Sequence, residues 1–136
     1  MKLNPYLHFN GNCLGAFEYY EKHLGGKITF KLTYGTSPSS GNVPADWQDK
    51  LAHITFALGD QEIQGSDCPP EYFQPIQGSY VSLNTDDAKE AERVFHALAD
   101  KGKVTMPFAQ TFWAYRFGMA VDQFGTPWMI NCTKTA

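Results

Sequence analysis

The chain has 136 residues, of which 43% are hydrophobic and 15% aromatic, and its formal net charge is −3. This length and composition favour one packed domain over a disordered segment or two independent domains. The mild charge, without clusters of lysine and arginine, argues against nucleic acid and anionic membranes as partners. The chain has neither a run of about 20 apolar residues, as a membrane span needs, nor the apolar core of a signal peptide at its amino terminus. Its three cysteines form no CxxC pair, so we expect a cytoplasmic protein with reduced thiols.

The first half of the chain predicts one helix and four strands. In chain order we expect a strand over 3–9, a helix over 13–24, strands over 27–34, 51–58 and 61–66, and a long loop over 35–50. Asn12 is a favourable N-cap for the helix, and Gly25 is a typical helix end. Gly59-Asp60 joins the last two strands as a hairpin.

The second half of the chain predicts the same order of elements. We expect a strand over 80–85, a helix that begins after Asp86 or Asp87 and ends near Asp100, and strands over 103–106, 112–121 and 127–133. Asp87 and Glu90 have the spacing of a capping box. The second half therefore reads as a copy of the first.

An internal repeat supports this interpretation. The segment 26–29 recurs as 102–105, at an offset of 76 residues (102 − 26), and apolar helix positions recur at an offset of 75. A duplicated unit buries its open face against its copy. We therefore predict an α+β fold in which two tandem βαβββ modules, about 3–66 and 79–133, form one cupped mixed sheet within a single domain over 1–136.

The same elements carry residues that point to a known family. These residues are 6–13, 16–20, 24–26, 52–53, 58–60, 106–107, 110–114, 117–118, Asp122, 124–125 and 127–132. In them the chain resembles the vicinal oxygen chelate superfamily of glyoxalases, bleomycin-resistance proteins and dioxygenases. Within that superfamily it is most similar to the PhnB-like, or demethylubiquinone methyltransferase-like, branch. The resemblance implies the cupped glyoxalase/bleomycin-resistance fold and a homodimer.

The resemblance also implies where a metal would bind. Metal-dependent members carry ligands on the first and last strands of each half, which fall here on Pro5, His53, Tyr80 and Met129. These positions are separated by 75 (80 − 5) and 76 (129 − 53) residues, in line with the repeat. Proline has no donor atom, and a thioether is a poor ligand for a hard or borderline cation. We therefore predict a pocket without metal or other cofactor.

Several side chains are candidates for binding a small molecule in that pocket. The predicted ligand-binding residues are Phe9, Tyr80, Gln110, Trp113, Tyr115, Met129 and Asn131. Trp113, Tyr115 and Phe117 alternate along one predicted strand, so they share a face that either stacks on a flat ligand or fills the core. A buried amide at Asn131 needs a hydrogen-bond partner from protein, water or ligand.

His53 is the titratable residue that the repeat places in the pocket. It is either a catalytic acid or base, or a core histidine bonded to a neighbour such as Tyr80 or Asn131. The leading functional hypothesis is a protein that binds a small aromatic or amphipathic molecule without metal. The alternative is a metal-independent enzyme that uses His53 as acid or base. A metal-dependent lyase or dioxygenase is a third possibility.

Overall fold

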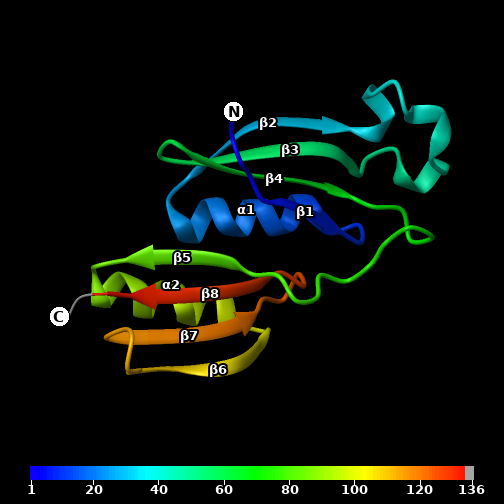
Figure 1. The fold of residues 1–136 in the computed structure, drawn as a ribbon. Helices are drawn as coiled ribbons and strands as arrows, with labels where there is room; N and C mark the ends of the chain where they lie inside the picture. The colour runs from blue at the N-terminus through cyan, green and yellow to red at the C-terminus, as the bar shows by residue number, and fades with distance from the viewer. Residues whose placement is uncertain (134–136) are drawn as a thin grey trace. The chain divides into compact units, whose positions relative to one another are not determined.

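A computed structural model describes residues 1–133 of the chain. It divides into two compact units, an N-terminal unit that ends at Pro75 and a C-terminal unit that begins at Ile76 (Figure 1). The assignment of both modules to a single domain remains a prediction.

The N-terminal unit is a four-stranded mixed sheet with one helix. Its elements are β1 (Tyr6–Phe9), α1 (Cys13–Leu24), β2 (Lys27–Thr33), three short 3₁₀ helices η1 (Tyr34–Thr36), η2 (Ser40–Asn42) and η3 (Ala45–Trp47), β3 (Leu51–Leu58) and β4 (Gln61–Asp67). The strand order is β1-β4-β3-β2. β1 runs parallel to β4, and the other neighbours are antiparallel.

The C-terminal unit repeats this topology. Its elements are β5 (Val81–Thr85), α2 (Ala88–Ala99), β6 (Lys103–Ala109), β7 (Arg116–Val121) and β8 (Pro127–Cys132). The strand order is β5-β8-β7-β6, and the one parallel pair is again the first strand with the last. The prediction of two tandem βαβββ modules in an α+β fold is therefore confirmed.

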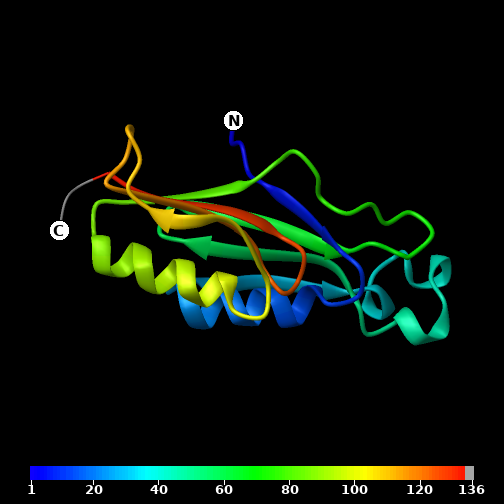
Figure 2. The same ribbon diagram turned by 90° about the horizontal axis from the view of Figure 1, so that it is seen from below.

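In each unit the helix covers one face of its own sheet (Figure 2). In the N-terminal unit, the ring of Phe17 on α1 packs against the rings of Phe9 and Phe56. In the C-terminal unit, the ring of Phe95 on α2 stacks on Phe108 with centroids 5.1 Å apart. Burying these aromatic side chains contributes to the hydrophobic driving force for folding. We call the other side of each sheet its open face.

The helix ends agree with the sequence predictions in part. Gly25 ends α1 with a left-handed φ of 82°, as predicted. Asn12 stands at the N-cap of α1 as predicted, but its side chain makes no cap hydrogen bond, and Asp67 accepts from the Cys13 N–H instead. At α2, Asp87 accepts from the Glu90 N–H as predicted.

Several predicted strand bounds are also corrected. β1 begins at Tyr6 rather than residue 3, and β6 continues to Ala109 rather than ending at 106. Neither described helix, at 12 residues each, is long and apolar enough to span a membrane.

Candidate functional site

The burial pattern assigns each strand residue of the N-terminal unit to one face of its sheet. Leu7 and Phe9 are buried, whereas Tyr6 and His8, which alternate with them along β1, are exposed. On β3, Ile54 is buried, as is Phe56, which contacts α1. Because side chains alternate across a strand, Tyr6, His8, His53 and Thr55 belong to the open face.

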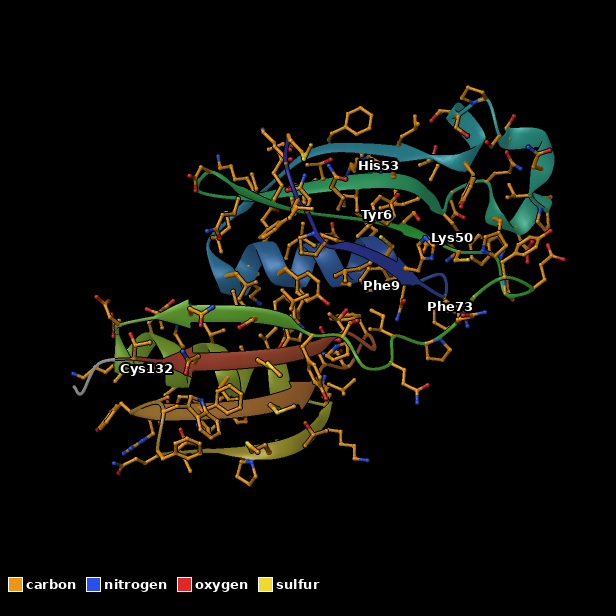
Figure 3. The ribbon with its side chains drawn as sticks, viewed as in Figure 1. Tyr6, Phe9, Lys50, His53, Phe73 and Cys132 are labelled. Atoms are coloured by element: carbon orange, nitrogen blue, oxygen red, sulfur yellow. The ribbon has the colours of Figure 1, made fainter. Side chains whose placement is uncertain are left out.

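The open face of the N-terminal unit carries a chain of three hydrogen-bonded side chains. The hydroxyl of Tyr6 lies 3.0 Å from Nδ1 of His53, and Nε2 of His53 lies 3.2 Å from the hydroxyl of Thr55. Tyr6 reaches across β4 to make this contact, because β4 lies between β1 and β3 (Figure 3). The ring of Phe30 lies 5.9 Å from that of His53. His53 thus has a hydroxyl at each ring nitrogen, and no carboxylate takes part in this chain.

The partners of His53 and the position of Phe9 differ from the predictions. Both partners of His53, Tyr6 and Thr55, belong to the N-terminal unit, whereas the predicted Tyr80 and Asn131 belong to the other unit. The expectation that Phe9 and His53 share a face is wrong. Phe9 is only 1% exposed and packs on Phe17 of α1, on the opposite side of the sheet.

The strand pairing also corrects the internal repeat. Tyr6 pairs with Gln64, as Ser82 pairs with Met129. Met129 on β8 therefore corresponds to Gln64 on β4, at an offset of 65 (129 − 64), and not to His53, which lies on β3. The predicted correspondence between His53 and Met129 is wrong, because the long loop between β2 and β3 has no equal in the second module. His53 therefore does not lie on the last strand of its module.

The predicted correspondence between the first strands of the two modules is also wrong, by one residue. Ser82 corresponds to Tyr6 at an offset of 76 (82 − 6), whereas pairing Tyr80 with Pro5 assumed 75. A shift of one residue moves a side chain to the other face of a strand. Tyr80 precedes β5 and is exposed.

The open face of the C-terminal unit presents a row of methionines. Ala120 and Trp128 are fully buried on the helix side, so Met119 and Met129 face the other way. Met119 pairs directly with Met129 on one side and with Met106 on the other. Three of the four methionines of the chain therefore lie side by side across three strands.

A second row on the same face combines an aromatic ring with two amides. Phe117 pairs with Asn131, and Asn131 pairs with Asn84. Nδ2 of Asn131 donates to Oδ1 of Asn84 at 3.2 Å, and Nδ2 of Asn84 donates to the Ser82 hydroxyl at 3.3 Å. Oδ1 of Asn131 is shielded from solvent and accepts no hydrogen bond among the described residues. The sequence singled out Asn131 and Met129, but it did not reveal Asn84, Ser82 or the methionine row.

The segment before β7 is a turn rather than the predicted strand. β7 begins at Arg116, because the Thr111 N–H donates to the Ala114 carbonyl and the Thr111 hydroxyl accepts from the Ala114 N–H. Trp113 still reaches the open face, where its ring lies 5.4 Å from Phe117. Gln110 and Tyr115, the other two predicted ligand-binding residues of this segment, do not join Trp113 in its contact with Phe117. Gln110 is exposed, and the Tyr115 ring is covered by the Arg116 guanidinium at 4.2 Å.

Asp67, at the end of β4, is a buried carboxylate that the sequence analysis missed. Its two oxygens accept from the backbone N–H groups of Cys13 and Leu51, each at 2.9 Å. Burial, with a smaller effect from the Asp67 charge, raises the pKa of the Cys13 thiol far above its ordinary value. Burial likewise raises the pKa of Tyr34, whose hydroxyl donates to the Asp67 carbonyl. These contacts tie β4 to α1, to β3 and to the segment after β2, so we assign them a structural role.

Within residues 1–133, no three histidine, cysteine, aspartate or glutamate side chains come together in a way that would hold a metal ion. His53 has hydroxyls as its hydrogen-bonding neighbours. The described donor set therefore does not fit the three-ligand centre of the superfamily's metal-dependent members.

Comparison with known proteins decides the lineage. A family model described as 3-demethylubiquinone-9 3-methyltransferase matches residues 1–131. The chain belongs to this family. Protein YjdN of Escherichia coli (strain K12) is 37% identical over 142 residues, covering 98% of this chain and 97% of YjdN. The crystal structure of protein PA1353 from Pseudomonas aeruginosa is 46% identical, covers 99% of each chain and superposes with a TM-score of 0.91.

More distant structures share the fold of the family. The PhnB protein from Bacillus cereus is 22% identical, covers 98% of this chain and 100% of its own, and has a TM-score of 0.82. The fosfomycin resistance protein FosX from Listeria monocytogenes is 7% identical, covers 98% and 94%, and has a TM-score of 0.67. These likenesses confirm the predicted fold, and the family match confirms the demethylubiquinone methyltransferase-like branch to which the sequence pointed.

Proposed function

We propose that this protein binds a small aromatic or amphipathic molecule, without a metal, on the open face of its C-terminal unit. The observation that carries the proposal is the uncovered apolar surface around Trp113. Trp113 is 52% exposed and packs on Phe117, and Met106 in the neighbouring row is 38% exposed. Exposed aromatic and methionine side chains that adjoin a few fixed polar groups are typical of small-molecule sites.

The methionine row supports a ligand that is flat or irregular in shape. Thioether side chains are flexible and polarisable, so Met119 and Met129 can adapt to different ring systems. Trp113 and Phe117 offer ring faces and edges for stacking. The amides of Asn84 and Asn131 lie beside this surface and would orient the ligand by hydrogen bonds.

A thermal-shift titration tests the proposal. A panel of one-ring and two-ring aromatic compounds is added to wild-type protein, to Trp113→Ala and to the matched control Tyr72→Ala, which removes an aromatic residue that is 72% exposed in the other unit. A ligand at ten times its Kd stabilises the native state by about 1.4 kcal/mol, which raises Tm by about 4 °C. We expect this shift in the wild type and in Tyr72→Ala, and its loss in Trp113→Ala. The proposal fails if no compound raises the wild-type Tm, or if Trp113→Ala responds as the wild type does.

The Tyr6–His53–Thr55 chain favours a second candidate function, a metal-independent enzyme. A neutral imidazole held between two hydroxyls can accept a proton at one nitrogen while it donates one at the other. We would incubate any compound that binds with wild-type protein, His53→Ala and the control His96→Ala, and follow products by mass spectrometry. Turnover that His53→Ala abolishes and His96→Ala preserves supports this function. Equal turnover in all three proteins, or none in the wild type, removes it.

Two further proposals concern the oligomeric state and the cellular location of the protein. From the resemblance to the superfamily we propose a homodimer, and from the spacing of the three cysteines we propose a cytoplasmic location. Light scattering of the purified protein tests the first proposal, and a mass of 15.2 kDa, that of one chain, would contradict it.

A further inference from the structure

We infer that Asn131 selects ligands that carry a hydroxyl group, a specificity that deepens the proposed small-molecule site and rests on it. The starting observation is Oδ1 of Asn131, which is shielded from solvent and accepts no hydrogen bond among the described residues. Leaving a buried carbonyl oxygen unpaired is unfavourable, because the atom has given up its hydrogen bonds to water. A ligand that donates to this oxygen recovers that cost.

The hydrogen-bonded neighbours explain why the unpaired atom belongs to Asn131. Its Nδ2 donates to Asn84, and Asn84 donates in turn to the hydroxyl of Ser82. The chain of donors therefore runs in one direction and ends at Ser82. The acceptor at its other end, Oδ1 of Asn131, is the atom that remains for a ligand.

The amide chain also determines which chemical group satisfies Asn131 best. If both amides turned over, the Ser82 hydroxyl would donate to Asn84, Asn84 would donate to Asn131, and Nδ2 of Asn131 would be the unpaired atom. An aromatic amine donates well but accepts poorly, because its lone pair is delocalised into the ring, so it satisfies the first arrangement best. An ether or ketone only accepts, so it satisfies only the second. A hydroxyl both donates and accepts, so it satisfies either arrangement.

The surroundings of Asn131 require that the rest of the ligand be apolar. Asn131 pairs directly with Phe117, whose ring contacts Trp113, and Met129 precedes it by two residues on the same face. Because Oδ1 is covered, a ligand reaches it only when a neighbouring side chain moves. Trp113, half exposed and outside the strand, is the side chain that we expect to move.

Four probes of similar size compare a hydroxyl, an amine, an ether and a purely apolar ligand: phenol, aniline, methoxybenzene and toluene. Their binding to the full-length protein is measured by tryptophan fluorescence and by thermal shift. We expect phenol to bind about fivefold to tenfold more tightly than toluene, since one hydrogen bond to a buried group contributes about that factor. In Asn131→Leu, phenol and toluene should bind equally. The control Asn42→Leu, at an exposed residue of η2, should keep the wild-type preference.

The outcomes distinguish this inference from the proposal on which it rests. Equal binding of phenol and toluene to the wild type overturns the selection by Asn131 and leaves the small-molecule site standing. A preference for phenol that persists in Asn131→Leu does the same. If none of the four probes binds and the larger aromatic panel also fails, the proposed function falls, and the inference falls with it.

Discussion

The carboxylate of Asp67 accepts a hydrogen bond from the backbone N–H of Cys13 at 2.9 Å, although the two residues are 54 positions apart. This bond replaces the side-chain cap that Asn12 does not make at the start of α1. The second oxygen of Asp67 binds the Leu51 N–H at the start of β3. One buried side chain thus joins the last strand of the module to its helix and to its third strand.

Replacing Asp67 should therefore destabilise the N-terminal unit. In Asp67→Ala two buried N–H donors lose their acceptor, and we expect the free energy of unfolding in urea to fall by about 3 kcal/mol. Asp67→Asn should cost less, because its amide oxygen still accepts from one of the two donors. Asp46→Ala, at an exposed residue of η3, is the control and should change stability by less than about 0.5 kcal/mol. A loss in Asp67→Ala no larger than in this control would contradict the structural role.

Gly118 should not tolerate a larger residue, because β7 lies against α2 at this point. A Cβ at Gly118 would come within 2.6 Å of the Phe95 ring and 3.0 Å of the Phe108 backbone. We expect Gly118→Ala to lower the free energy of unfolding by about 2 kcal/mol, measured by chemical denaturation. A Cβ at Gly41 meets nothing within 4 Å, so Gly41→Ala should be neutral or slightly stabilising. Similar stability of the two variants would show that this close approach is absent.

The hydrogen bond between Tyr6 and His53 should control the tautomer of the imidazole. In Tyr6→Phe, Nδ1 of His53 loses its hydroxyl neighbour while Nε2 keeps Thr55. We expect the ¹⁵N chemical shifts of the His53 ring to change, and stability to fall by less than about 1 kcal/mol because the site is partly exposed. Unchanged His53 shifts in Tyr6→Phe would mean that the hydrogen bond does not form in solution, whereas His96 should be unaffected in either case.

Stability should decrease at alkaline pH because of the buried Cys13. Burial raises the pKa of Cys13 above its ordinary value of 9.0, so the folded chain holds this proton more tightly than the unfolded chain does. The resulting stabilisation is complete below about pH 9 and is lost as the pH rises further. Urea unfolding between pH 8 and about pH 10.5 measures the decrease. Cys13→Ala should make it shallower, and Cys68→Ala, at a residue that is not fully buried, should leave it as in the wild type. If stability decreased as steeply with pH in Cys13→Ala as in the wild type, groups other than Cys13 would be responsible for the decrease.

The boundaries of the two α-helices were predictable because short-range chemistry determines them. The helix over 13–24, its end at Gly25 and the cap at Asp87 follow from residues within one turn of each other, and the structure confirms them. The turn before β7 was not predicted, although it too depends on a local interaction. The Thr111 hydroxyl accepts a hydrogen bond from the Ala114 N–H, which competes with strand pairing. The alternation of Trp113 and Tyr115 in the sequence nevertheless favoured the prediction of a strand.

The candidate site was only partly predictable. Asn131 and Met129 were correctly placed on one face, since both lie on β8 two residues apart. Phe9 was placed on the wrong side of its sheet, because alternation separates two faces without telling which one the helix covers. The partners of His53 lie on β1 and β3, and no sequence spacing connects Tyr6 with His53.

The order of strands and helices, the duplication and the family all follow from the amino-acid sequence. These depend on periodicity, turn residues and the repeated order of elements along the chain, all of which are local or additive. Which residues of the two modules correspond, in contrast, became clear only from the pairing of the strands. A constant offset fails after the loop between β2 and β3, and backbone pairing then matches Met129 with Gln64 rather than with His53. Register is set by hydrogen bonds between distant strands, and a slip of one residue reverses every face.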